Sequence, residues 1–182
     1  MLAMTGIAFL LLFVTFAIMH TVGLYTRGIA IRQINQVGRQ VTQDISQAIR
    51  YGGDVTVMSD RLCSGAYSYI PNGTFQDSSE SFGLVKISDT AKAYCDGSDQ
   101  MPNKSDSQIL IDGGVAQVLE MDVIPWDVSG PMYEVKIVIS TAGDNRAEKD
   151  PFTDEYYCDP QNGKYCAFGT FETTVYARKN KE

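Results

Sequence analysis

The four cysteines of this 182-residue chain are the side chains with the most predictable chemistry: Cys63, Cys95, Cys158 and Cys166. They permit three disulfide pairings. Cys158 and Cys166 flank a turn-rich loop of seven residues, so a bridge between them is geometrically easy and leaves Cys63 for Cys95. Zinc is the alternative, but the sequence has no CxxC and its spacings differ from those of structural zinc sites. Disulfides are favoured, and they indicate an oxidising, extracytoplasmic environment.

His20 is the only histidine, and it lies in an apolar segment. The rest of the chain therefore has no imidazole for Ser-His-Asp or Cys-His catalysis. The motifs GxGxxG, GxxxxGK[ST] and HExxH are absent, and no pair of carboxylates is singled out by an apolar setting. We expect the protein not to be an enzyme. We interpret His20 as a packed polar side chain of a membrane helix rather than a proton relay.

Two acidic stretches, residues 96–99 and 144–155, offer the hard oxygen ligands that calcium prefers. Neither has the regular spacing of an EF-hand loop. The sequence therefore favours solvated acidic loops, with calcium binding as the alternative and no other cofactor expected.

The N-terminal segment, residues 1–26, contains no Asp, Glu, Lys or Arg. The segment exceeds the roughly 20 apolar residues that a helix needs to cross a bilayer. It lacks the basic start and small-residue cleavage site of a signal peptide. Basic residues follow the segment, which by charge bias places the body in the cytoplasm, whereas the cysteines place it outside. Removal of a short basic leader reconciles the two, so we expect a processed chain beginning at Met1.

The helix continues beyond the apolar segment. Apolar residues recur at helical spacing on one stripe, and the opposite face is rich in Arg and Gln and includes Asp44. Glycines at 52 and 53 predict the end of the helix. Gly23 to Gly28 is the region where we expect it to bend or unwind. The sequence thus predicts a helical stem over residues 1–52, with residues 1–26 as the transmembrane segment or filament core. The stripe consists of Ala30, Ile34, Val37, Val41, Ile45, Ala48 and Ile49.

Residues 53–182 are expected to form a β-rich extracellular head. Six segments are rich in β-branched and aromatic residues: 66–70, 82–87, 108–111, 115–124, 132–139 and 167–177. The predicted fold class is α+β, with the long N-terminal helix packed on an antiparallel sheet. The first 50 residues carry four Arg against one Asp, a net charge of +3. The remaining 132 carry 11 basic and 21 acidic residues, a net charge of −10, which argues against a nucleic-acid surface.

This pattern resembles the mature type IV pilins and pilin-like proteins. The resemblance rests on residues 1–50, an apolar helix without a preceding charge that runs into an amphipathic half, followed by an acidic β-rich body with a cysteine pair near the C-terminus. It implies that Met1 is the methylated residue left by leader cleavage, and that the apolar helices bundle into a filament core.

Thr5 stands where the family has a glutamate that is thought to neutralise the amine of a neighbouring subunit. A threonine hydroxyl can accept a hydrogen bond or bond back to the helix, but it carries no charge. The proline common in the middle of the family's apolar segment is also missing. Major pilin, minor pilin and pseudopilin therefore stay open as classes, as does a divergent lineage.

The resemblance implies a structural subunit of an extracellular type IV pilus-like filament that supports adhesion, motility or DNA uptake. Such a subunit is a homo-oligomer or assembles with other pilins. It resides in the cytoplasmic (inner) membrane before assembly and at the cell surface afterwards. The alternatives are a membrane-anchored extracytoplasmic binding domain and a pseudopilin of a type II secretion-like system.

Overall fold

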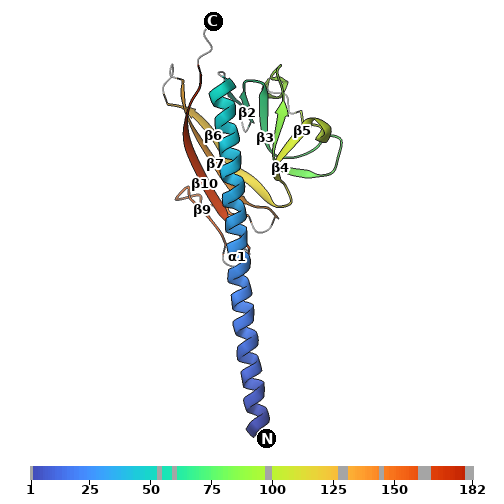
Figure 1. The fold of residues 1–182 in the computed structure, drawn as a ribbon, viewed down its shortest axis with the longest axis vertical. Helices are drawn as coiled ribbons and strands as arrows, with labels where there is room; N and C mark the ends of the chain where they lie inside the picture. Colours follow the sequence, from blue (N-terminus) through green and yellow to red (C-terminus); the bar gives the residue numbers. More distant parts are fainter. Residues whose placement is uncertain are drawn as a thin grey trace.

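The computed structural model describes residues 2–52, 55–58, 61–96, 100–126, 131–143, 146–159 and 165–178. One helix, α1 (Leu2–Gly52), forms a rod whose upper half lies against the head and whose lower half extends away from it (Figure 1). The unwinding expected between Gly23 and Gly28 is wrong, because α1 is continuous through this region, whereas the bend expected there stays a prediction. A glycine costs only about 1 kcal/mol in a helix, which the surrounding helix-forming residues offset.

Two antiparallel sheets and a short hairpin make up the described head. The five-stranded sheet has the order β1-β2-β3-β4-β5, and the three-stranded sheet has the order β10-β7-β6. The bounds of the first sheet are β1 (Val55–Met58), β2 (Arg61–Ser64), β3 (Tyr67–Thr74), β4 (Ser81–Ser88) and β5 (Ser107–Asp112). Those of the second are β6 (Ala116–Pro125), β7 (Met132–Thr141) and β10 (Phe168–Tyr176), while β8 (Glu148–Lys149) pairs with β9 (Tyr156–Tyr157). The described residues also include two short 3-10 helices, η1 (Ala93–Cys95) and η2 (Lys104–Asp106).

The main core lies between the amphipathic half of α1 and the sheets. Ile34, Val41, Ile45 and Ile49 are almost completely buried, which confirms the predicted stripe. They pack with inward-facing residues of the three-stranded sheet, including Val135, Ile137, Ile139 and Val175. Gly38 permits the closest approach, since a Cβ atom at this position would lie 2.0 Å from the ring of Phe171. The fold is therefore α+β, with the stem packed on antiparallel sheets.

Asn72 joins the two sheets. Its φ angle of 41° places it in the left-handed region that asparagine tolerates better than most residues. Its side-chain amide donates to the backbone carbonyl of Val118, and its side-chain oxygen accepts from the Val118 N–H at 3.0 Å. The side-chain amide of Asn72 thus makes the two backbone hydrogen bonds that a neighbouring strand would otherwise make with Val118 of β6. This contact lies beside the register shift between Val118 and Glu120. This pairing fixes the five-stranded sheet against the three-stranded sheet.

Two disulfides hold the peripheral segments. Cys63 in β2 bonds to Cys95 in η1, and Cys158 bonds to Cys166 ahead of β10. This is the pairing that the sequence favoured among the three possible ones, and it confirms disulfides rather than the alternative zinc site. The first bridge closes a loop with a sequence separation of 32 residues and the second one of 8 residues. Both bridges therefore restrict the unfolded chain, the first more than the second.

Candidate functional site

The lower half of α1 presents an apolar surface in every direction. Among the described side chains of residues 7–31, every large apolar one is exposed, with Phe9 80% and Phe13 76% accessible. The region qualifies by length and composition as a membrane span, with a mean hydropathy of 1.8 over its most apolar window and none of that window buried. Such a surface is not stable in water, so lipid or other protein must cover it.

The polar groups within this surface are satisfied internally. The hydroxyl groups of Thr15 and Thr21 each donate to the carbonyl four residues earlier at 2.8 Å, and that of Thr26 lies 3.0 Å from the carbonyls of Val22 and Gly23. His20 is exposed on the same surface. These bonds within the helix suit an environment without water. Thr5 lies in α1 but its side chain is outside the described residues, and Met1 is outside them altogether.

Asp44 attaches the stem to the five-stranded sheet. Its carboxylate accepts a hydrogen bond from the Tyr69 hydroxyl at 2.8 Å, and both of its oxygens lie 3.0 Å from Lys86 Nζ. The Lys86 ammonium also lies 4.2 Å from the centre of the Tyr67 ring. Burial, followed by the bond to Asp44, raises the pKa of the Tyr69 hydroxyl. The upper half of the stem is thereby held by charge as well as by apolar packing.

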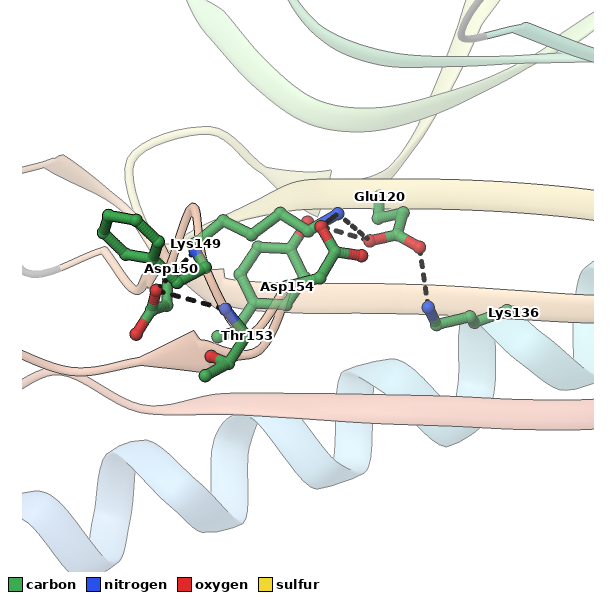
Figure 2. A network of polar contacts seen from close by, with 8 residues as sticks. Glu120, Lys136, Lys149, Asp150, Thr153 and Asp154 are labelled. Atoms are coloured by element: carbon green, nitrogen blue, oxygen red, sulfur yellow. Dashed lines mark hydrogen bonds and ion pairs between the residues drawn. The ribbon is translucent and has the colours of Figure 1, made fainter.

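A second polar network attaches the β8–β9 hairpin to the three-stranded sheet. Glu120 accepts from Lys136 at 2.7 Å and from the Tyr156 hydroxyl at 2.9 Å, and Lys149 lies 3.6 Å from it. Lys149 also pairs with Asp154 at 2.9 Å. Figure 2 shows Lys136 and Lys149 directed at Glu120. The network joins segments 36 residues apart in the sequence and fixes the hairpin on the sheet.

The pKa shifts in this network follow from its geometry. The bond from Lys136, opposed by burial, lowers the pKa of Glu120 to about 2. The same bond raises the pKa of Lys136. Burial, followed by the bond to Glu120, raises the pKa of Tyr156 to about 12. The neighbouring Asp122 has a raised pKa because of burial and the adjacent Glu120 carboxyl group. Glu120 is therefore a firmly ionised structural carboxylate at neutral pH.

The acidic stretches proposed as calcium ligands lie partly outside the described residues, which exclude 97–99 and 144–145. In the described part, Asp150 accepts from the backbone N–H groups of Phe152 at 2.8 Å and Thr153 at 3.3 Å. Asp154 pairs with Lys149. No group of three or more potential metal-ligating side chains converges within the described ranges. These carboxylates therefore serve the loop itself, and calcium binding stays a prediction.

Sequence reasoning missed the two networks. It placed Asp44 on the polar face of the stem, without a role in docking. The available signal was that Asp44 is the only acidic residue on a stem otherwise rich in Arg and Gln. For Glu120, the signal was a charged residue within a β segment, and its partners Lys149 and Tyr156 follow about 30 residues later or more. In both cases the partner residues come from other elements.

No family model matches this chain, and neither does any curated protein or solved structure. The architecture itself, a long N-terminal apolar helix on antiparallel sheets, is compatible with that of pilins. The apolar half suggests membrane insertion or a signal role, and the disulfides suggest exposure outside the cytoplasm.

Proposed function

We propose that the protein is a structural subunit of an extracellular type IV pilus-like filament that assembles through the apolar half of α1. One observation carries the proposal: a single continuous helix packs on the head along its upper half and exposes apolar side chains on all sides of its lower half. A monomeric anchor needs only about 20 residues of apolar helix and no helical continuation packed on the head.

The energetics favour bundling once the helix leaves lipid. Covering a large apolar side chain is worth roughly 1.5–3 kcal/mol, so the side chains between Ile7 and Ile31 together provide a strong drive for association. Gly6 and Gly23 leave room for close approach, since nothing lies within 4 Å of a Cβ atom placed at either. Helices associate closely at such small residues. The docking of the upper stem by Asp44 would hold each head at a fixed place on the filament.

The experiment uses the full chain purified in detergent. On detergent removal we expect filaments that sediment and are visible by electron microscopy. Phe13→Asn, which places a polar amide on the exposed apolar surface, should reduce the sedimented fraction. The matched control is Phe152→Asn, because Phe152 is 95% exposed on the head. Dispersed monomers, or irregular aggregates that Phe13→Asn leaves unchanged, would instead favour a membrane-anchored binding domain.

Three finer aspects of the proposal need separate tests. Mass spectrometry of the native protein should find a methylated N-terminus at Met1, as the resemblance to pilins implies. Localisation of the native filament distinguishes the roles of pilus and pseudopilin, because a pseudopilin stays within a secretion machine. Adhesion, motility and DNA uptake are then assayed in a strain that lacks the protein.

A further inference from the structure

The exposed back of the upper stem carries a stripe of arginines. Arg32 and Arg39 are seven residues apart, about two helical turns, and Arg50 follows eleven residues later, about three turns. All three are exposed, as are Gln36 and Gln43 on the same side. Within the part of the chain that the structure describes, none of these guanidinium groups makes an ion pair. Asp44, the only carboxylate of the stem itself, is turned towards Lys86. Arg39 and Gln43 line a groove together with residues of β10 that include Glu172.

A surface of opposite character lies on the three-stranded sheet. Val135, Ile137 and Val123 face α1, so the alternating residues of β6, β7 and β10 face away from the stem. We call this side the outer face. Its lower row places Lys136 between Asp122 and Glu172, its middle row pairs Glu134 with Ile124 and Thr174, and its upper row pairs Met132 with Tyr176.

Aromatic side chains extend the upper row of the outer face. Trp126, whose backbone N–H donates to the Met132 carbonyl at 2.9 Å, is 65% exposed. Tyr176 is 64% exposed, and Ile124 beside them is 57% exposed. Large apolar side chains clustered beside carboxylates are typical of an interaction surface rather than of a solvated one.

The chemistry of the outer face suits arginine. A guanidinium group pairs with carboxylates through its fork of N–H donors and stacks on the faces of Trp and Tyr. The lower row, with Asp122 and Glu172, and the upper row, with Tyr176 and the adjoining Trp126, are four residues apart along each strand, about 13 Å. Arg32 and Arg39 are separated by about 10.5 Å along the helix. β10 runs alongside the upper half of α1 (Figure 1). A neighbouring copy whose stem is parallel to this one therefore presents its arginines along the strands of the outer face.

We infer that the arginine stripe of one copy binds the outer face of a neighbouring copy, with Asp122, Glu134 and Glu172 pairing its guanidinium groups and Trp126 and Tyr176 stacking on them. The occupant is a second copy of this chain, because the stripe and the outer face have opposite charge and comparable spacing. The contact also separates the arginines of neighbouring stems, which repel each other if stems bundle back to back. This inference rests on the proposed filament.

The test measures assembly of the full chain after detergent dilution. Arg32→Glu and Glu134→Arg should each raise the critical concentration for assembly about tenfold, which corresponds to about 1.4 kcal/mol. The double variant should return to within about threefold of the wild type, because the swapped charges attract again. Asp106→Arg reverses an exposed carboxylate in η2 and should have little effect.

Trp126 supplies an independent readout, since it is the only tryptophan in the chain. Its emission should shift to shorter wavelength when wild-type filaments form, and the shift should be reduced in Arg32→Glu. Filaments that form without the shift, or a double variant no better than the weaker single variant, would overturn this contact and leave the filament proposal standing. If the wild type forms no filaments, both this contact and the filament proposal are refuted.

Discussion

Replacing Asp44, the only carboxylate of the stem, by asparagine should destabilise the protein more than the neutral exchange of any carboxylate on the β8–β9 hairpin. The substitution keeps the shape of the side chain and removes its charge. Lys86, whose side chain is only 15% exposed, then loses both of its 3.0 Å contacts to the carboxylate. The hydroxyl group of the fully buried Tyr69 keeps an amide oxygen as acceptor, but loses a charged one.

The magnitude follows from these contacts. A hydrogen bond to a charged group contributes about 1.5–3 kcal/mol, and an isolated buried charge costs more. The Asp44 side chain is itself 29% exposed, so water can partly replace it. We therefore expect a loss of about 2 kcal/mol in the free energy of unfolding. The measurement is urea unfolding of the full chain in nonionic detergent, followed by Trp126 fluorescence.

Asp154→Asn is the matched control. Asp154 pairs with Lys149 at 2.9 Å, a similar distance, but its side chain is 85% exposed. An exposed pair contributes little, so the expected loss is under about 0.5 kcal/mol. A double-mutant cycle of Asp44→Asn with Lys86→Met isolates the pair and should give a coupling of about 1–2 kcal/mol. Equal losses for Asp44→Asn and Asp154→Asn, or no coupling with Lys86, would refute the assigned role of Asp44.

Three further predictions concern the head and its docking. The pKa of Glu120 is lowered from 4.5 to about 2, so its ionised form stabilises the fold above about pH 4.5 and this contribution is lost as the pH falls towards 2. Glu120→Gln should therefore cost about 1–2 kcal/mol at pH 7 and much less at pH 2.5, measured by urea unfolding, whereas an equal cost at both pH values contradicts the assignment. Replacing Cys63 and Cys95 together by serine should cost about 4 kcal/mol, against about 2.5 kcal/mol for Cys158 and Cys166, because the first pair closes a 32-residue rather than an 8-residue separation; thermal unfolding in detergent decides the order. Gly38→Ala should destabilise by about 1 kcal/mol or more, since its methyl group meets the Phe171 ring, whereas Gly28→Ala, with open space around it, should be neutral or stabilising; finding the two alike would refute the close packing of stem and β10.

The helical stem was predictable because its signal is local. The apolar stripe repeats at the period of the helix over residues 30–49, and the buried residues Ile34, Val41, Ile45 and Ile49 are those of the predicted stripe. The six expected strands correspond to β3, β4, β5, β6, β7 and β10. β-Branched and aromatic runs between turn residues mark strands of six residues or more. The four strands that were missed are two or four residues long and carry too few positions to form a pattern.

The division into two sheets was not predictable in the same way. Strand order depends on pairings between residues far apart in the chain, and the alternation of residues within one strand does not specify its neighbour. Asn72 illustrates this, because a turn asparagine gives no local indication that it bonds to Val118, 46 residues later. For the disulfides, the sequence indicated a preference for one of three possible pairings and did not fix it.

The sequence by itself determined a long helix with an apolar half and an amphipathic half. The absence of charge over residues 1–26 and the helical period beyond them are properties of neighbouring residues. The tertiary structure decided what the polar residues of the stem and sheets do. Asp44 differs from the arginines and glutamines around it only through Lys86 and Tyr69, which lie 42 and 25 residues away. The outer face likewise exists only because β6, β7 and β10 lie in register. Charge acts through space, and only the folded chain sets those distances.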